Sequence, residues 1–341
     1  MEETKKRKLS KGTRVLLIIV CILVGIAVLL SATVFVLSKL GHKALTDDGS
    51  GMTMADEETE NTGTIRYKGK LYRYNDEIST VLLMGIDNYE KSPEATEFGE
   101  GNQSDVNVLA VMDPKNEKLT MIAVSRDAMC DLDVLDDTGE YAGTAHAQLA
   151  LAYSYGEGAE RSCELTRDAV SRIFYGLSIP AYGSMYFNGL GNIVECLGGI
   201  TITPTENAYG FEAGVPVALT GSEAQGYIRY REHTIEGNNE RMERQKQVMS
   251  ALARTAIERA KANPTSILDI YRSAQKDVTT NLNASMIVYL AQLATKLDFD
   301  GEILKVPGES VLGEQEHAEF IVDEDALYEM ILDIFYLEVA E

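Results

Sequence analysis

The longest hydrophobic segment of the chain runs from Val15 to Ser38, twenty-four positions without a charged side chain. A helix rises about 1.5 Å per residue, so about 20 apolar residues cross the hydrocarbon core of a bilayer. The fourteen residues before the segment are rich in lysine and arginine, which favours a cytoplasmic N-terminus. A cleaved signal peptide is the alternative, but its apolar core is usually about 7–15 residues long. The pattern predicts a single-pass protein of the cell membrane, with a cytoplasmic tail (1–14) and a transmembrane helix (15–38).

The extracellular remainder divides into three parts by composition. Residues 39–70 are mostly polar and acidic and contain several glycines, so they predict a flexible tether without a core. Residues 71–262 contain short apolar runs and segments of helical periodicity, which predict the main folded domain. Residues 263–341 are expected to form a C-terminal extension packed on that domain.

Short apolar runs predict the strands of a buried sheet. The first three expected strands are Ser79–Gly85, Val106–Met112 and Leu119–Val124, and the last two are joined by a polar segment that contains Pro114 and Asn116, typical of a β-hairpin. Further strands are expected at Tyr182–Phe187 and Gly199–Ile202, and helices at Ala145–Tyr155, Cys163–Tyr175, Asn188–Leu197, Ser222–Arg229 and Glu240–Ala262. Mixed strands and helices with an antiparallel hairpin predict an α/β fold, an α-β-α sandwich around a central mixed sheet.

Charge and cysteine content narrow the class of protein. The whole chain carries a net charge of −22, and the first fourteen residues hold six basic and two acidic side chains, so the remainder carries −26. Nucleic-acid binding needs a basic surface, and it is therefore excluded as a function of this acidic domain. Three cysteines follow the apolar run, at positions 130, 163 and 196, so at most one disulfide can form within the chain.

Two carboxylates and an arginine lie at the ends of the expected strands. Asp87 follows the first strand, Asp105 precedes the second, and Arg126 follows the third. If the second and third strands pair through their hairpin, Asp105 and Arg126 lie at the end of the sheet opposite the turn, and the first strand brings Asp87 there. The ends of strands are where α/β folds usually bind ligands.

A cluster of arginines follows later in the chain, at Arg229, Arg231, Arg241 and Arg244. Arg241 and Gln245 are four residues apart and share one face of a helix, and Arg244 borders that face. Guanidinium groups bind phosphate oxygens in pairs. Two carboxylates beside them suit Mg²⁺, or Mn²⁺, which typically bridges one or two carboxylates to a phosphate. Together the residues predict a site for Mg²⁺ and phosphate.

Each of these features also has a purely structural interpretation. Asp87 after a strand could belong to a turn, Asp105 could be a capping residue, and the arginines could form surface ion pairs, which contribute about 0–1 kcal/mol each. His146 and His233 lack a second ligand at metal-binding spacing, and no Gly-x-Ser-x-Gly or Walker-type loop occurs in the chain. The order of the motifs along the chain therefore carries the functional prediction.

That order resembles the LytR-CpsA-Psr family of bacterial cell-envelope proteins. The resemblance covers about residues 79–260 and rests on eight elements: Val81-Leu-Leu-Met-Gly-Ile-Asp87, Ser104-Asp105, Val124-Ser-Arg-Asp127, Ala150-Leu-Ala-Tyr153, Leu197-Gly-Gly-Ile200, Leu219-Thr-Gly-Ser-Glu-Ala224, Tyr227-Ile-Arg-Tyr-Arg231 and Arg241-Met-Glu-Arg-Gln245. It implies that residues 71–262 are a catalytic domain of this family. The implied enzyme is a Mg²⁺-dependent phosphotransferase that moves a glycopolymer, such as teichoic acid or capsule, from a polyprenyl-pyrophosphate carrier to peptidoglycan.

The resemblance also implies roles for individual residues. Asp87 and Asp105 correspond to the metal-binding carboxylates. The residues that correspond to the pyrophosphate-binding group are Arg126, Arg229, Arg231, Arg241 and Gln245, with Arg244 a weaker member. Asp105, Arg126, Arg231 and Arg241 are the implied catalytic residues, and replacing Asp105 or Arg231 with alanine is expected to abolish polymer attachment.

The chain departs from the family pattern at three places. Gln103 stands where an arginine often precedes the Ser-Asp pair, Ser125 stands where a proline often precedes Arg-Asp, and Gly237-Asn238 replaces a common Gly-Asp pair. These departures leave three alternatives open: a protein that binds polyprenyl-linked polymer without transferring it, a regulatory protein, and a polyprenyl-pyrophosphate pyrophosphatase. The helices expected between Ala145 and Leu197 are candidates for the lining of a groove for the lipid chain.

Overall fold

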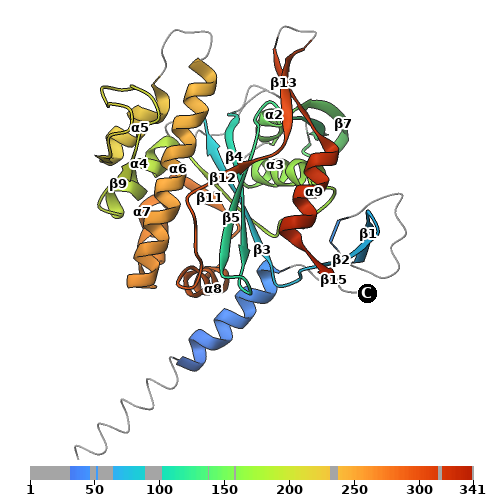
Figure 1. Cartoon of the computed structure of the whole chain (residues 1–341), viewed down its shortest axis with the longest axis horizontal. Coiled ribbons are helices and arrows are strands. Elements are labelled where there is room, and N and C mark those ends of the chain that lie inside the picture. Colours follow the sequence, from blue (N-terminus) through green and yellow to red (C-terminus); the bar gives the residue numbers. More distant parts are fainter. Residues whose placement is uncertain are drawn as a thin grey trace, which may run out of the picture.

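The computed structural model describes residues 31–46, 51–52, 64–88, 102–136, 138–156, 159–230, 237–313 and 317–339 (Figure 1). Residues 15–30 of the predicted transmembrane helix and the candidate Arg231 lie outside these ranges. Among the residues that are described, no helix combines the length and the apolar character needed to cross a bilayer. Residues 31–45 form a helix that ends next to the start of the central sheet, where Thr46 bridges to Ser79.

A six-stranded mixed sheet forms the centre of the domain, in the order β11-β8-β3-β4-β5-β12. Its strands are β3 (Ser79–Ile86), β4 (Ser104–Asp113), β5 (Lys118–Val124), β8 (Ala181–Met185), β11 (Val278–Thr280) and β12 (Ile303–Lys305). The pairs β3–β8 and β5–β12 are parallel, and the other pairs are antiparallel. The predicted α/β class with a central mixed sheet is therefore confirmed, including the hairpin between β4 and β5.

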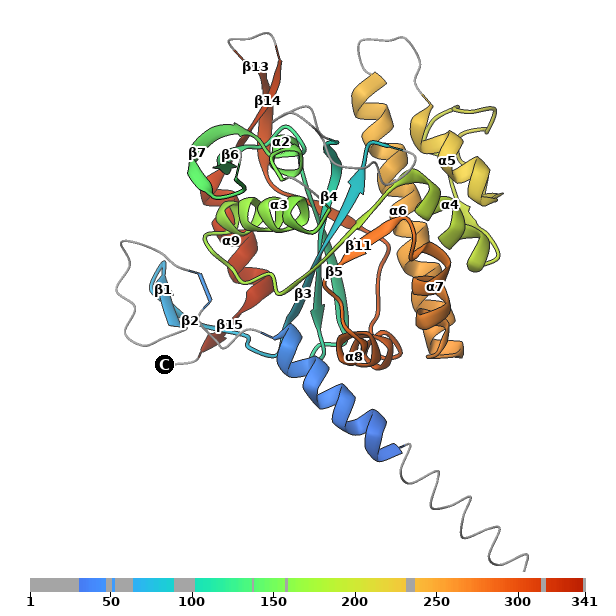
Figure 2. The same cartoon turned by 180° about the vertical axis from the view of Figure 1, so that it is seen from behind.

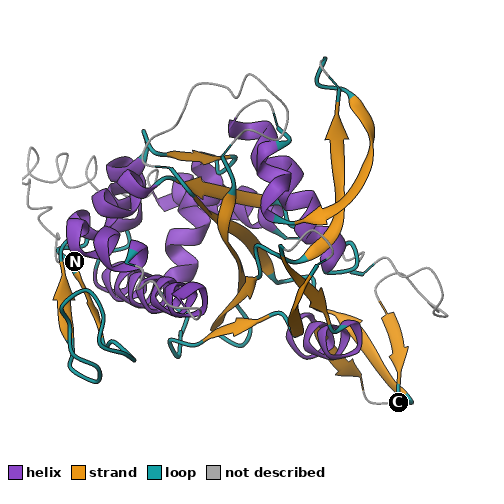
Figure 3. Ribbon diagram, turned by 90° about the horizontal axis from the view of Figure 1, so that it is seen from above, coloured by secondary structure: helices purple, strands orange, loops and turns teal. Residues whose placement is uncertain are grey.

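Helices cover both faces of this sheet (Figures 2 and 3). The helices α2 (Ala150–Ser154), α3 (Ala159–Ile173) and α9 (Glu324–Phe335) share one hydrophobic core with the sheet. The helices α6 (Gly237–Ala262) and α8 (Ala284–Ala294) and residues 44–45 of the first helix share a second core on the other face. Beside it, α4 (Phe187–Cys196), α5 (Gly221–Arg229) and α7 (Ser266–Ala274) pack with a small sheet of β9 (Ile200–Ile202) and β10 (Val217–Leu219).

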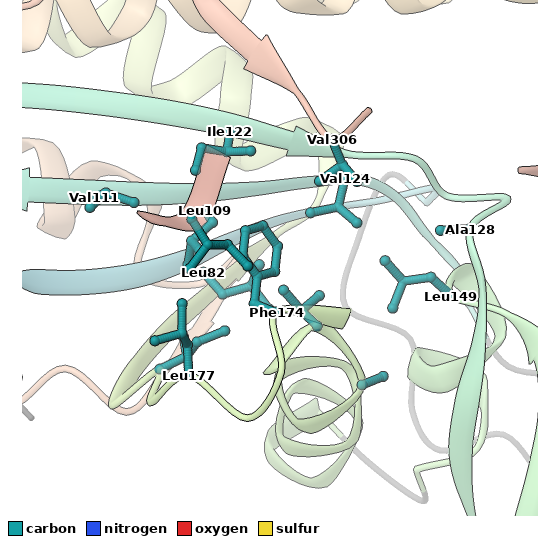
Figure 4. Packing of buried hydrophobic residues seen from close by; sticks show 14 of the residues in the cluster. Leu82, Leu109, Val111, Ile122, Val124, Ala128, Leu149, Phe174, Leu177 and Val306 are labelled. Atoms are coloured by element: carbon teal, nitrogen blue, oxygen red, sulfur yellow. The ribbon is translucent and has the colours of Figure 1, made fainter. Parts of the chain in front are cut away.

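Alternation along β3 explains how one strand serves both cores. Leu82 belongs to the core with α3, whereas Val81 belongs to the core with α6, because successive side chains of a strand point to opposite faces. Both faces are buried, so the strand reads as a continuous apolar run. Figure 4 shows Leu82 and Leu109 packed against Phe174 at the centre of the first core. Burying each such side chain contributes about 1.5–3 kcal/mol.

The C-terminal residues contribute more to the domain than the predicted extension implies. β11 and β12 both follow residue 262, and they form the two edges of the central sheet. The segment 263–341 thus supplies two strands of the sheet, and the boundary drawn at residue 262 crosses a single folded unit. These two strands could not be predicted from the sequence pattern, because β11 and β12 are only three residues long.

Three smaller hairpins lie around the sheet. β2 (Lys70–Tyr74) pairs on one side with β1 (Thr64–Tyr67) and on the other with the C-terminal strand β15 (Tyr336–Val339). β6 (Met129–Leu135) pairs with β7 (Tyr141–Gln148), and β13 (Gly308–Leu312) pairs with β14 (Ala318–Val322). Residues 145–148, predicted as helix, therefore lie in a strand: alanines favour helix, but pairing with β6 overrides that local preference.

The predicted tether is partly wrong as well. Residues 39–45 continue the first helix, and the side chain of Leu45 is fully buried. Gly41 allows this helix to approach α8 closely, because a Cβ at this position would lie 2.1 Å from the Ser285 carbonyl oxygen. Ser38 Oγ also donates a hydrogen bond to Gln292 Oε1 at 2.6 Å. Residues 64–70 form β1 and the turn to β2, whereas residues 47–50 and 53–63 are outside the described ranges.

Candidate active site

Three strand ends meet at the end of the sheet that lies opposite the first helix (Figure 1). Ile86 pairs with Ser104 across β3 and β4, and Asn107 pairs with Val124 across β4 and β5. Asp87 follows Ile86 directly, and its backbone N–H donates to the Gln103 carbonyl oxygen at 3.2 Å. Asp87, Asp105 and Arg126 therefore lie at the same end of the sheet, as the hairpin predicted.

A β-bulge sets the direction of the Asp105 side chain. Gly85 pairs with Val106 and Ile86 pairs with Ser104, so Asp105 is an extra residue in β4 without a partner in β3. Bulges redirect side chains and are frequent beside active sites. Asp105 and Val106, which would point to opposite faces of a regular strand, both line the same cavity. The bulge thus brings the carboxylate to the face of the sheet that α6 covers.

Asp105 is the centre of a network of charges. One of its carboxylate oxygens accepts from Arg126 Nη1, and the other lies 3.5 Å from Arg241 Nη1. Arg126 Nη2 also donates to Gln103 Oε1 at 2.6 Å. The Asp105 side chain is only 9% exposed, so its ion pairs are poorly screened by solvent. Gln103 therefore contributes to the site as an acceptor that orients Arg126.

Backbone hydrogen bonds hold the loop that carries Arg126. The N–H of Ala150, at the start of α2, donates to the Arg126 carbonyl oxygen at 2.9 Å. The N–H of Phe320, on β14, donates to the Asp127 carbonyl oxygen at 2.8 Å. Elements far apart in the sequence thus fix this loop. Contacts of this kind could not have been predicted from the local pattern.

Asp127 lies beside the network, and the pKa of its carboxyl group is raised. Burial raises the pKa of its carboxyl group, and this effect outweighs the opposing attraction of the Arg126 and Arg241 guanidinium groups. Its Oδ1 lies 3.5 Å from Arg126 Nε. A raised pKa in a site rich in arginine marks Asp127 as a candidate functional residue that the site prediction did not include. Its position directly after Arg126 was the available signal.

The raised pKa predicts how Asp127 affects stability. The folded protein binds this proton more tightly than the unfolded chain does, so the ionised carboxylate opposes folding at pH 7. The Asp127→Asn variant is therefore expected to have a higher free energy of unfolding than the wild type at pH 7. The gain should disappear below about pH 4, where the carboxyl group is protonated in both states. Urea unfolding at pH 7 and pH 3.5 checks this, and an equal gain at both pH values would contradict it.

Arg244 forms its ion pair with Glu206 rather than with Asp105, although it lies three residues from Arg241. Its side chain is 1% exposed and donates through Nη1 to Glu206 Oε1 and through Nη2 to the Tyr230 carbonyl oxygen at 2.6 Å. Its guanidinium carbon lies 5.6 Å from the centre of the Tyr230 ring. These contacts give Arg244 a structural role, since they tie α6 to the end of α5 and to the loop after β9.

This role of Arg244 predicts that loss of the Glu206 carboxylate destabilises the folded protein. Removing one partner of a buried ion pair leaves the other charge uncompensated, which costs about 3–5 kcal/mol. The Glu206→Ala variant is expected to lose about 2–3 kcal/mol of unfolding free energy, less than for a fully buried pair, because the Glu206 side chain is 32% exposed and the Tyr230 carbonyl oxygen still accepts from Arg244. Glu212→Ala, an exposed change in the same loop, is the matched control. Equal stability of the two variants by urea unfolding would argue against the structural role.

Two other predicted residues lie at the edge of the site. Gln245 lines the same cavity as Asp105, one turn of α6 beyond Arg241. Arg229 is the last residue of α5 and is exposed, with its guanidinium carbon 5.4 Å from the centre of the Phe187 ring. Phe187 lines the cavity too, so Arg229 lies at its rim.

An apolar cavity with a volume of about 320 Å³ begins at Asp105 and Gln245. It lies between the sheet and α4, α6 and α7, and nearly all of its wall is apolar: the lining includes Leu83, Val106, Met185, Leu190, Ile193, Val248, Met249, Leu252, Ala253, Ala256, Ile270 and Val278. From Gln245 to Ala256 the cavity follows α6 for about 16 Å, at about 1.5 Å per residue. Apolar cavities of this size are typical of binding sites for small molecules.

The helices expected between Ala145 and Leu197 lie on different faces of the sheet. Of these helices, α4 lines the cavity, whereas α2 and α3 pack in the core on the opposite face. Most of the helical wall comes from α6, whose apolar residues Val248, Leu252 and Ala256 continue the stripe that starts at Gln245. That stripe at helical spacing was the signal in the sequence.

The donors at the strand ends suit a divalent cation. Mg²⁺ usually takes one or two protein carboxylates and completes its shell with water and phosphate oxygens. Asp87, which is exposed, and Asp105 meet this requirement, because the contact between Asp87 and Gln103 holds the two segments side by side. The described part of the chain has no group of three or more His, Cys, Asp or Glu side chains that could hold a metal ion. The donor set therefore fits an ion shared with a ligand.

The cysteines are separate from this site. Cys130 and Cys163 are buried, Cys196 is partly buried, and all three are free thiols. Burial raises the pKa of the Cys130 thiol to about 12, so this cysteine stays protonated near neutral pH.

The fold and the site together define an α/β protein in which paired carboxylates and arginines open into an apolar cavity. The chain belongs to the LytR_cpsA_psr family, whose model matches residues 44–331. A similar curated protein is the polyisoprenyl-teichoic acid–peptidoglycan teichoic acid transferase TagU of Halalkalibacterium halodurans, with 28% identity over 52% of this chain. The match spans 53% of that relative, about half its length.

Other relatives match more of the chain. The transferase of the same name from Enterococcus faecalis is 27% identical over 73% of each protein. The crystal structure of Bacillus subtilis TagV superimposes with a TM-score of 0.55 at 27% identity, and the match covers 75% of this chain and 94% of that one. The family resemblance seen in the sequence motifs is therefore confirmed.

Proposed function

We propose that this protein is a membrane-anchored extracellular phosphotransferase that moves a glycopolymer from a polyprenyl-pyrophosphate carrier to peptidoglycan. One observation carries the proposal: Asp105 belongs both to the charged network with Arg126 and Arg241 and to the wall of the apolar cavity. A ligand that fills both needs an ionic head and an apolar tail. The names of the relatives, which act on polyisoprenyl-linked teichoic acid and peptidoglycan, describe such a donor.

The proposed reaction forms one bond to phosphorus and breaks another. A hydroxyl oxygen of the peptidoglycan acceptor attacks the phosphoryl group that carries the glycan, and the bond to the second phosphate breaks, leaving polyprenyl phosphate. Arg126 and Arg241 stabilise the charge on the transferred group and on the leaving phosphate. Asp87 and Asp105 would hold Mg²⁺, which would offset phosphate charge and polarise the transferred group. The proton of the acceptor hydroxyl passes to a carboxylate of the site.

The predicted transmembrane segment supports the same proposal. A polyprenyl carrier resides in the membrane, so a helix at residues 15–38 would raise the effective concentration of the carrier at the site. The described end of the first helix is packed on α8 through Gly41 and Ser38. The folded domain would then follow the anchor without a long flexible connection.

A comparison of three ligands tests the proposed donor. Titration of the full chain in detergent micelles with polyprenyl pyrophosphate, with polyprenol and with inorganic pyrophosphate, each with Mg²⁺, separates the contributions of head and tail. Polyprenyl pyrophosphate is expected to bind much more tightly than either of the others, because only it occupies both parts of the site. If polyprenol bound with equal affinity, the charged network would not be part of the binding site. If inorganic pyrophosphate bound with equal affinity, the cavity would not be part of it.

A further inference from the structure

An exposed tyrosine, Tyr209, lies in a strained turn of a loop that is anchored on α6. In the loop between β9 and β10, Ala208 and Phe211 exchange two backbone hydrogen bonds, of 3.1 and 2.9 Å. The two residues between them, Tyr209 and Gly210, have positive φ angles of 53° and 81°. A two-residue turn of this kind favours asparagine followed by glycine, and a bulky residue at positive φ is an outlier. Strain of this kind, worth about 1–3 kcal/mol, clusters at functional sites.

The surroundings of Tyr209 hold its ring in one position. Its ring centre lies 5.6 Å from that of Phe211 and 6.1 Å from that of Tyr230, both in edge-to-face geometry. Gly226 makes room for the Tyr209 hydroxyl, since a Cβ at Gly226 would lie 2.1 Å from that oxygen. The Tyr209 residue is nevertheless 38% exposed. The turn therefore presents a fixed aromatic ring to solvent.

Contacts with α6 connect this ring to the active site. Glu206 pairs with Arg244, and Gln247 Nε2 donates to Thr205 Oγ1 at 2.8 Å, so the loop is anchored on α6 at two points. Arg244 lies one turn of α6 from Arg241, which pairs with Asp105. The Tyr230 ring therefore lies beside Arg244 on the stretch of helix that supplies a charge to the active site, and the Tyr209 ring packs edge-to-face against Tyr230.

We propose that Tyr209 and Tyr230 bind an uncharged sugar ring of the substrate by stacking. This inference rests on the proposed function, in which sugars flank the transferred phosphoryl group. The C–H face of a pyranose ring packs on an aromatic ring, and its hydroxyl groups remain hydrated at an exposed site. The aromatic rings themselves carry no charge, and the exposed Glu212 of the same loop disfavours a polyanionic segment of a polymer. The ligand is therefore a neutral sugar such as an N-acetylhexosamine.

Such a sugar has two possible sources, the linkage unit of the donor and the glycan strand of the acceptor. The full chain in micelles is titrated with chitotriose, a soluble trimer of N-acetylglucosamine, to represent the acceptor. For the donor, the affinity for polyprenyl-pyrophosphate-N-acetylglucosamine is compared with that for polyprenyl pyrophosphate. The wild type is expected to bind the trimer, or to prefer the lipid that carries the sugar.

The key variant is Tyr209→Asn, because asparagine suits the positive φ and preserves the turn. It is expected to weaken the sugar-dependent binding about tenfold, as loss of an aromatic stacking partner does, while the affinity for polyprenyl pyrophosphate stays the same. Tyr209→Phe should bind like the wild type, since it keeps the ring. Tyr141→Ala removes another exposed tyrosine, in β7, and should have no effect.

The outcomes separate this inference from the proposed function. Loss of trimer binding assigns the ring to the acceptor, and loss of the preference for the sugar-bearing lipid assigns it to the donor. Wild-type binding that shows no dependence on the sugar, or a Tyr209→Asn variant with unchanged sugar dependence, overturns the inference. A Tyr209→Asn variant that loses affinity equally for the lipid with the sugar and the lipid without it also overturns the inference. A wild-type protein that does not bind polyprenyl pyrophosphate at all would instead contradict the proposed function.

Discussion

Replacing Asp105 with alanine is expected to reduce polymer transfer by at least about 10³-fold while the domain remains folded. Asp105 contacts both Arg126 and Arg241 and is also a proposed ligand of Mg²⁺. Its removal would leave two guanidinium groups without the carboxylate that orients them, and it would remove a cation ligand. Loss of a single electrostatic contact typically costs 10²–10³ in rate, so the combined loss is expected to be larger.

Two further variants make this test specific. Asp105→Asn keeps the size of the side chain and loses the charge, so it should be almost as inactive as the alanine variant. Asp131→Ala removes an exposed carboxylate that pairs with His146 on the hairpin of β6 and β7, and it should transfer normally. Circular dichroism verifies folding in each case. Activity of Asp105→Ala within tenfold of the wild type would show that the charged network is not the catalytic centre.

Filling the apolar cavity is expected to abolish transfer by a different route. Of the α6 residues that line the cavity, Ala256 is the one farthest along the helix from Gln245. A tryptophan at this position would occupy the space that the proposed lipid tail needs and leave the charged network unchanged. The variant is expected to lose at least about 100-fold in affinity for polyprenyl pyrophosphate, since each buried CH₂ group contributes about 0.8 kcal/mol. Its affinity for inorganic pyrophosphate should not change.

The same helix offers a matched control. Ala262 is the last residue of α6, is exposed and does not line the cavity. Ala262→Trp introduces the same side chain outside the cavity, and it should bind and transfer like the wild type. The natural chain has no tryptophan, so each variant carries a single fluorophore. Lipid should change the emission of any Ala256→Trp protein that still binds it. Normal transfer by Ala256→Trp would exclude the cavity as the lipid site.

The central strands could be predicted because each is a short apolar run bounded by turn residues. The runs at 79–85, 106–112 and 119–124 lie within β3, β4 and β5. The convergence of Asp105 and Arg126 followed from the hairpin alone, since antiparallel pairing places both at the end opposite the turn. In these segments, local pattern and tertiary pairing agree.

Other parts of the fold depend on contacts that a local pattern does not encode. Residues 145–148 have helix-forming alanines but pair with β6, and residues 64–67 are too short and polar to stand out as a strand. The bulge that redirects Asp105 arises from a mismatch between two strands. The different surroundings of Arg241 and Arg244 also depend on tertiary structure, because only the fold brings Glu206 to Arg244.

The transfer reaction is the most direct test of the proposed phosphotransferase activity. The full chain in micelles is incubated with Mg²⁺, peptidoglycan oligomers and a polyprenyl-pyrophosphate-linked glycan labelled in its sugar, and the products are identified by mass spectrometry. We expect a labelled phosphodiester between glycan and peptidoglycan, with one polyprenyl phosphate released for each link, and neither product from Asp105→Ala. Release of polyprenyl phosphate with only free sugar phosphate, or binding of the donor without any turnover, would contradict the account.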